Sequence, residues 1–259
     1  MTVETDGRYQ REKDFHDSTP SERWNAVSKF YDVAEPSLAA HRSLVLGECR
    51  GRRVLDYGCG EGETALMLAE HGALVTGIDI SGRRIEKARE AGEGLEKVSF
   101  HVMNAEQLTF DDRSFDLVCG TSILHHLDLD RALGEISRTL APEGKAIFLE
   151  PLGHNPFIKL YRKLTPGFRT DDEHPLLMRD FEIFERHFGS VETSFFHLTS
   201  LASVVAQRTR FFAPVSRALE AVDGVLFSSL PLTKRYAWIV VLVLARPRSD
   251  GLANVPSSA

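Results

Sequence analysis

Three glycines at alternate positions, Gly58, Gly60 and Gly62, follow a short hydrophobic segment and precede a helical pattern. Glycine allows the backbone to approach a ligand closely and to adopt conformations that a side chain forbids. The neighbouring acids Asp56 and Glu61 repel a pyrophosphate, so the turn suits a cationic or zwitterionic nucleoside better than a dinucleotide. A tight turn with no ligand is the alternative explanation for such a motif on its own.

Further polar residues end the hydrophobic segments that follow this turn. Asp79 lies about 20 residues beyond the glycines, where a carboxylate can accept hydrogen bonds from ribose hydroxyls. Asn104, Ala105 and Glu106 end the next segment, where an adenine edge would lie. A nicotinamide-dependent oxidoreductase is disfavoured, because the dinucleotide fingerprint has a small residue where Glu63 stands.

Two adjacent histidines, His125 and His126, follow the fourth strand signal. They cannot share one helical face, so at most one of them is expected to face a substrate. A neutral imidazole there can remove a hydroxyl proton, and Glu150, which ends the fifth strand signal, would complete a base-and-orienter pair if it lay close to His125. The alternatives are two structural histidines at the sheet edge, and a Glu150 that caps a helix or forms a salt bridge.

The elements that must position these residues alternate between strand and helix. Strands separated by helices of this length form parallel βαβ units, which predicts an α/β fold with a Rossmann-like, doubly wound, mostly parallel sheet. The apolar run 236–245 is half as long as a membrane helix of ~20 residues and is typical of a late strand buried on both faces. The predicted strands are 52–58, 73–79, 98–103, 115–121, 145–150, 191–197 and 236–245. The predicted helices are 63–71, 81–91, 129–140 and 178–187, with an amphipathic region at 200–223 and a helix that begins near Thr19.

Composition narrows the class of protein. Of the 259 residues, 42% are hydrophobic and 26% are charged, which excludes a chain that is disordered, collagen-like or coiled-coil overall. The net charge of −6 lacks the basic excess of a nucleic-acid-binding domain. Three cysteines form no CxxC pair, which favours a reducing compartment. The N-terminus lacks the apolar stretch of a signal peptide, and no membrane span is predicted, so the chain is expected to be cytoplasmic.

Four motifs, taken in order, resemble those of the class I S-adenosylmethionine-dependent methyltransferases. They are most similar to the small-molecule group that includes ubiquinone, menaquinone, sugar and natural-product enzymes. The resemblance implies S-adenosylmethionine as cofactor, S-adenosylhomocysteine as product, and a seven-stranded sheet with an antiparallel late strand, an N-terminal helical cap and an inserted lid after strand five. The motifs are VLDYGCGEG, TGIDIS, NAEQLTFDDRSFDLVCGTSILHHL and KAIFLEP, within residues 50–151.

The resulting organisation is one methyltransferase domain at 19–248. Polar composition predicts mobile tails at 1–18 and 249–259. The proline-containing segment 151–177 is expected to be irregular and is long enough for a lid. The domain then comprises a helical cap at 19–50, a cofactor-binding half at 51–150, the lid insertion at 151–177, and an acceptor side with the final strands at 178–248.

The resemblance also implies which residues hold the cofactor. The glycine turn faces its methionine portion, with Asp56 beneath the ammonium group, while Asp79 holds the ribose and Ile80 lies against the adenine. The family usually has Asp where Asn104 stands, and an Asn side chain can still accept from the adenine amino group and donate to a ring nitrogen. The predicted cofactor-binding residues are Tyr31, Asp56, Gly58, Cys59, Gly60, Gly62, Asp79, Ile80, Asn104, Ala105, Glu106, Gly120 and Thr121.

Similar sugar and phenol methyltransferases have a general base in the motif that contains His125. The leading hypothesis is therefore methyl transfer to an oxygen of a small, partly apolar metabolite, with His125 as base and Glu150 and His126 as further catalytic candidates. The alternatives are a nitrogen of an amine or modified peptide, a carbon of a quinone-like ring, and a non-catalytic protein that binds the cofactor. Nucleic acid is not expected as a partner, no oligomeric state is predicted, and no metal is predicted, because no spaced ligand set appears. The predicted acceptor-binding residues are Trp24, Tyr31, His154, Tyr161, Arg162, Arg169 and His174.

Overall fold

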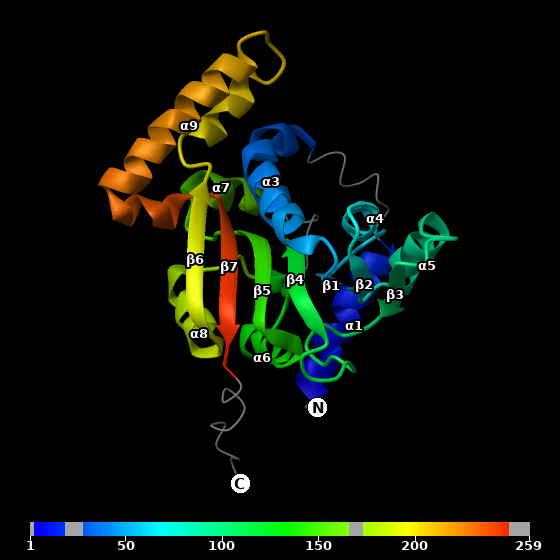
Figure 1. The fold of residues 1–259 in the computed structure, drawn as a ribbon. Helices are drawn as coiled ribbons and strands as arrows, with labels where there is room; N and C mark the ends of the chain where they lie inside the picture. Colours follow the sequence, from blue (N-terminus) through cyan, green and yellow to red (C-terminus); the bar gives the residue numbers. More distant parts are fainter. Residues whose placement is uncertain (1–2, 19–27, 166–172, 249–259) are drawn as a thin grey trace.

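A seven-stranded sheet forms the centre of the protein (Figure 1). The computed structural model describes residues 3–18, 28–165 and 173–248. The strands are β1 (Arg53–Tyr57), β2 (Leu74–Asp79), β3 (Val98–Val102), β4 (Phe115–Thr121), β5 (Leu140–Pro151), β6 (Phe188–Phe196) and β7 (Ile239–Pro247). They follow the order β3-β2-β1-β4-β5-β7-β6, in which β1 to β5 are parallel and β7 is antiparallel to both neighbours. The prediction of a mostly parallel α/β sheet with an antiparallel late strand is confirmed.

Helices cover both faces of this sheet. The α-helices are α1 (Val3–Ser18), α3 (Ser28–Cys49), α4 (Glu63–Glu70), α5 (Gly82–Ala91), α6 (Leu129–Thr139), α7 (Pro156–Leu164), α8 (Phe181–His187) and α9 (Phe212–Ser229). Short 3₁₀ helices are η2 (Leu124–His126), η4 (Met178–Asp180), η5 (Ser200–Ala206) and η6 (Pro231–Tyr236). One apolar cluster joins the sheet to Leu68 of α4 and Ile85 of α5, and another joins it to Leu133 of α6 and Phe184 of α8. Apolar burial on both faces explains why the strands read as continuous hydrophobic runs.

The sheet reverses its strand order at β1. β2 lies on one side of β1 and β4 lies on the other, so the loops that leave β1 and β4 diverge and open a crevice at the carboxyl ends of the strands. The register pairs Asp56 with Cys119 and Thr121 with Leu149. The glycine turn, η2 and the end of β5 therefore lie at the same edge of the sheet.

The N-terminal segment differs from the prediction. A mobile tail at 1–18 is wrong for Val3–Ser18, which form α1 beside α5 (Figure 1). Polar contacts hold this helix: Arg8 pairs with Glu106, and the Ser81 hydroxyl donates to Asp17 Oδ1 over 2.5 Å. Because these contacts are polar and distant in sequence, α1 carries no apolar periodicity that sequence analysis could detect. The predicted helix start near Thr19 and the predicted tail at 249–259 lie outside the described residues.

The second half of the chain contains more helix than expected. The insertion 151–177, predicted to be irregular, includes α7, whose start is capped by the Asn155 side chain accepting from the backbone N–H groups of Phe157 and Ile158. The late apolar run forms β7, which begins at Ile239 rather than at 236. No helix among the described residues is long and apolar enough to cross a membrane.

Candidate active site

The glycine turn after β1 combines left-handed backbone with open space. Gly58, Gly60 and Gly62 have φ values of +78°, +54° and +90°, a region that side chains disfavour. A Cβ on Gly58 would come within 2.9 Å of Ile123, whereas a Cβ on Gly60 would meet no atom within 4 Å. Gly60 thus has open space beside its backbone, as a ligand cradle requires.

Gly120 has a different reason to be glycine. A Cβ there would lie 2.7 Å from Phe148 and 2.8 Å from the Tyr57 carbonyl oxygen. Close packing between β4 and its neighbours therefore accounts for Gly120 without any ligand. Its predicted contact with the cofactor stays a prediction.

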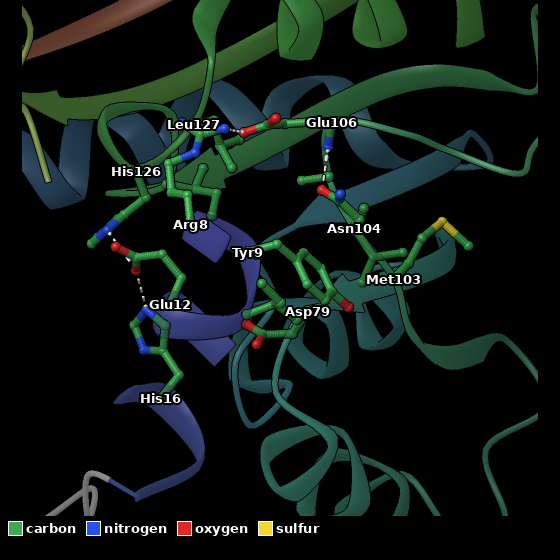
Figure 2. Close-up of a pocket in the computed structure, with 15 residues that line it drawn as sticks. Arg8, Tyr9, Glu12, His16, Asp79, Met103, Asn104, Glu106, His126 and Leu127 are labelled. Atoms are coloured by element: carbon green, nitrogen blue, oxygen red, sulfur yellow. Dashed lines mark hydrogen bonds and ion pairs between the residues drawn. The ribbon is translucent and has the colours of Figure 1, made fainter. Parts of the chain in front are cut away.

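Asp79 ties the second strand to the glycine turn. Its two carboxylate oxygens accept from the backbone N–H groups of Gly60 (3.0 Å) and Ser81 (2.9 Å). Each oxygen keeps a further lone pair, and the side chain lines a pocket at this edge of the sheet (Figure 2). The carboxylate is therefore held in a fixed position from which it can accept from ribose hydroxyls.

Asp56 is a buried acid that a cation would satisfy. Burial and the charge of Asp79 raise the pKa of Asp56 to about 7, although a hydrogen bond from the Ala65 backbone opposes the shift. Its Oδ2 atom is buried and accepts no hydrogen bond from the described residues. An ammonium group beside this carboxyl would favour its ionised form. The residues present thus fit the predicted cofactor at its ribose and ammonium ends.

Helix α1 forms one wall of the pocket. Arg8, Tyr9, Glu12 and His16 line it from α1, opposite Asp79 and the 104–106 turn, and Tyr9 points inward from α1 in Figure 2. Sequence analysis missed all four of these residues, because they fell in the segment taken for a tail. The helical spacing of Glu12 and His16 was the only available signal, and it is also typical of an ordinary surface pair.

The predicted adenine border is held by its own hydrogen bonds. Asn104 Oδ1 accepts from the Glu106 backbone N–H over 2.9 Å. The Glu106 side chain accepts from the Asp128 backbone N–H over 2.9 Å and pairs with Arg8 of α1. Ile80 and Ala105 line the same pocket. The Asn104 side chain therefore fixes the turn, and Asn104 lines the pocket.

His125 and Glu150 form the hydrogen-bonded pair that the base hypothesis requires. One Glu150 oxygen accepts from the backbone N–H groups of Ile123 (2.9 Å) and Leu124 (2.8 Å), and the other lies 2.7 Å from His125 Nδ1. Because the carboxylate only accepts, Nδ1 carries the proton and Nε2 is free to accept. Burial, followed by the neighbouring His126, lowers the pKa of His125 despite the charge of Glu150. The imidazole is thus neutral at physiological pH.

The inserted segment returns to this pair. Glu173 Oε1 lies 3.8 Å from His125 Nε2 and accepts from Arg162 of α7 over 2.5 Å. The His174 backbone N–H donates to the His125 carbonyl oxygen over 2.9 Å. Although burial alone would raise it, the facing His125, His126 and Arg162 lower the pKa of Glu173. Glu173 is a site residue that sequence analysis did not select.

The other predicted acceptor residues fall elsewhere. His154 lines a separate groove with Arg179 and Arg235, and His174 is exposed to solvent. Tyr161 is half-buried in α7, next to Arg162. Trp24, Arg169 and the side chain of Tyr31 lie outside the described residues.

Two groups of histidines and acids are compact enough to share a cation. The donor atoms of Glu12, His16 and His126 lie within 4.8 Å of one another, as do those of His125, His126 and Glu173. Glu12 is 3.3 Å from His126 Nδ1 and 3.5 Å from His16 Nε2. The ion-pair contacts of Glu12 explain the first arrangement, and we assign no metal to either group.

Known proteins are similar to this chain in sequence. Residues 55–148 match the family described as "Methyltransferase domain". Methyltransferase GfsG of Streptomyces halstedii is 32% identical over 68% of this chain and 63% of that protein. The ubiquinone biosynthesis O-methyltransferase of Coxiella burnetii is 35% identical over 38% of this chain and 43% of that protein. The chain spans less than two thirds of the length of these curated relatives.

Solved structures share the fold. Magnesium protoporphyrin IX methyltransferase of Synechocystis PCC 6803, solved with SAH bound, superposes with a TM-score of 0.61 at 18% identity, over 92% of this chain and 99% of that one. At this identity the likeness carries the fold alone. The match over 55–148 adds the family, and the glycine turn with Asp56 and Asp79 adds a fitting cofactor site. The chain therefore carries a class I S-adenosylmethionine-dependent methyltransferase domain.

Proposed function

We propose that the chain transfers a methyl group from S-adenosylmethionine to an oxygen of a small, partly apolar metabolite. The observation that carries this proposal is the buried His125–Glu150 pair, with Nδ1 of His125 2.7 Å from the carboxylate. Such a pair leaves Nε2 as a proton acceptor at the edge of the sheet where the cofactor site lies. A protein that only stored the cofactor would have no use for a neutral, oriented imidazole there.

The cofactor is held by the turns after β1, β2 and β3. Bound S-adenosylmethionine supplies a methyl group on a positively charged sulfur. Asp56 would meet the ammonium group and Asp79 would accept from the ribose, while Gly60 would let the methionine portion approach the backbone. Helix α1 lines the pocket with Tyr9 and Arg8. These residues align the methyl group, and alignment is the main work of such a transfer.

His125 acts as the general base that removes the proton of the acceptor hydroxyl. As the new carbon–oxygen bond forms and the carbon–sulfur bond breaks, Nε2 accepts the hydroxyl proton. Glu150 holds Nδ1–H and stabilises the imidazolium that results. The lowered pKa of His125, caused by burial, keeps the base unprotonated before the reaction. A neutral amine needs less help from a base, so this pair favours oxygen over nitrogen as the nucleophile.

The acceptor approaches Nε2 beside Glu173 and Arg162. An anionic acceptor group, such as a carboxylate or phosphate, competes with Glu173 for the Arg162 guanidinium. Cys49, Cys59 and Cys119 are buried free thiols, which supports the predicted reducing, cytoplasmic setting.

The test combines binding with a product screen. The full chain is titrated with S-adenosylhomocysteine by calorimetry, then incubated with methyl-labelled S-adenosylmethionine and panels of phenols, hydroxy acids, amines and quinols, with mass spectrometry as readout. We expect labelled methyl ethers or esters, and we expect His125→Ala to lower turnover while binding stays within about threefold, since His125 does not line the pocket. His71→Ala, at an exposed histidine after α4, is the matched control. Cofactor binding with label only in amines or ring carbons would overturn the oxygen assignment, and unchanged turnover of His125→Ala would remove its role as base.

A further inference from the structure

Helix α7 turns an apolar stripe toward solvent. Phe157, Leu160 and Leu164 are 72%, 57% and 72% exposed, and their i, i+3, i+7 spacing puts them on one face of the helix. An amphipathic helix ordinarily packs such a stripe against its own domain. In α7, Ile158 is the buried apolar residue, and the larger stripe lies outside. An outward stripe of this kind marks an interaction surface.

Lysines flank the stripe. Lys159 and Lys163 are exposed and lie four residues apart on the same helix, adjacent to Leu160 and Leu164. Long lysine side chains can extend past an apolar surface and present their ammonium groups above it. The helix therefore offers bulky apolar groups and positive charges together, although the whole chain has a net charge of −6.

Exposed apolar and basic side chains also occur on η6 and beside it. Asn155, which caps α7, donates from Nδ2 to the Tyr236 carbonyl oxygen at the end of η6 over 2.8 Å, and the two elements lie side by side in Figure 1. Leu232 of η6 is 83% exposed and lines a groove with Arg179 and Arg235. Burial, then the charges of Arg235, Lys159 and Arg179, lower the pKa of His154 in this groove, against the opposing charge of Asp180. Positive charge is therefore concentrated here.

We propose that this region, the α7 surface, docks onto the surface of an anionic phospholipid membrane. Apolar side chains of an interfacial helix enter the boundary between headgroups and acyl chains, while basic side chains meet the anionic headgroups. A second copy of the chain is a poorer occupant, because symmetric pairing would bring the same basic groups face to face. The α7 surface consists of Phe157, Leu160, Leu164 and Leu232 with Lys159, Lys163, Arg179 and Arg235.

Docking would also orient the acceptor side. Arg162 belongs to α7 and pairs with Glu173, which lies 3.8 Å from His125 Nε2. A membrane under α7 therefore lies next to the part of the chain where a partly apolar acceptor enters. The docking proposal itself needs no methyl transfer, so its test does not depend on the acceptor.

The test is flotation of the full chain with vesicles of phosphatidylcholine that contain phosphatidylglycerol, compared with phosphatidylcholine alone. We expect binding to the anionic vesicles that added salt weakens. The double variant Phe157→Ser/Leu164→Ser should lower the partition coefficient at least about tenfold, and Lys159→Gln/Lys163→Gln should lower it roughly fivefold for each lysine. Leu74→Ser/Leu95→Ser, at exposed leucines near β2 and β3, is the matched control and should bind like the native chain. Thermal melts check that every variant is folded.

Any one of five results would overturn the proposal. The first two are that the native chain does not float with anionic vesicles, and that it floats equally well with neutral ones. The next two are that Phe157→Ser/Leu164→Ser binds as well as the native chain, and that the Leu74/Leu95 control loses as much binding as Phe157→Ser/Leu164→Ser does. The last is a sedimentation result in which the native chain is a dimer and Phe157→Ser/Leu164→Ser is a monomer. That result would assign the α7 surface to a second copy of the chain.

Discussion

Replacing Glu150 by Gln changes the hydrogen-bonding character of one group and preserves its shape. In the native chain one oxygen accepts from the backbone N–H groups of Ile123 and Leu124, and the other accepts from His125 Nδ1 at 2.7 Å. A Gln oxygen can keep both backbone bonds. Its NH₂ group then faces Nδ1, and because an amide nitrogen only donates, Nδ1 must become the acceptor. The imidazole proton therefore moves to Nε2.

The expected loss of kcat in Glu150→Gln follows from the protonation of His125 Nε2. With a proton already on Nε2, His125 cannot accept one from the acceptor, and the contribution of a general base is lost. General bases contribute about 10²–10⁴-fold to rate, so we expect kcat to fall by that factor in Glu150→Gln. Stability should fall by only about 1–3 kcal/mol, because one charge-assisted hydrogen bond is replaced and both backbone donors stay paired. Glu150→Ala is the contrast, because it strands two buried N–H groups and should destabilise the fold more.

The assay separates chemistry from binding and folding. Turnover is measured with an acceptor from the product screen, S-adenosylhomocysteine affinity by calorimetry, and unfolding by urea titration. The expected pattern is a large loss of kcat with affinity within about threefold of native, since Glu150 lies behind His125 and not in the cofactor pocket. Native turnover in Glu150→Gln would refute the tautomer argument. A loss of turnover that matched a loss of cofactor affinity would refute it as well, since Glu150 would then be purely structural.

Three further predictions concern pH and stability. Burial raises the pKa of Asp56 to about 7, so its carboxyl is neutral below pH 7. S-adenosylhomocysteine should therefore bind about tenfold more tightly at pH 8 than at pH 6. Calorimetry at the two pH values tests this, and an affinity that does not change with pH would contradict it. The lowered pKa of His125 keeps the base neutral in mildly acidic solution, so the acid limb of kcat should lie below the ordinary histidine value of 6.5, and a limb above 6.5 in a pH–rate profile would contradict the assignment. Buried Asp223 accepts hydrogen bonds from the Leu198, Thr199 and Ser200 backbone and from two hydroxyls. Asp223→Ala leaves these donors unpaired, so it should lower the free energy of unfolding by about 3–5 kcal/mol in urea titration. An Asp223→Ala loss below about 1 kcal/mol would show that these donors find other partners.

The cofactor half was predictable because its signals are local. β4 occupies 115–121 and α4 begins at Glu63, as the sequence predicts. β2 and β4 are short apolar runs that end at the polar residues Asp79 and Thr121, and glycines at positive φ separate β1 from α4. The position of Asp79 next to the glycine turn followed from the rule that ligands bind at the carboxyl ends of parallel strands.

The parts of the site formed by α1 and by Glu173 depend on contacts that no sequence pattern predicts. Arg8 and Glu106 are 98 positions apart, and each alone looks like an ordinary surface charge. Glu173 lies in an acidic stretch that composition cannot distinguish from a solvated loop, yet it reaches His125. Pairing between distant charged residues has no periodicity, so α1 and the acceptor side could not be derived from pattern alone.

The adjacent histidines explain how the two halves of the site meet. His125 and His126 have ring centroids 4.3 Å apart, but successive residues of a 3₁₀ turn point about 120° apart. His125 therefore contacts Glu150, while His126 contacts Glu12 of α1 and lines the cofactor pocket. Burial lowers the pKa of His125; burial alone would also lower that of His126, but Glu12 and the nearby Glu173 raise it. Under the proposed function, one dipeptide thus supplies the base, His125, and a contact to Glu12 of α1, through His126. Exchanging either histidine should therefore affect a different half of the site.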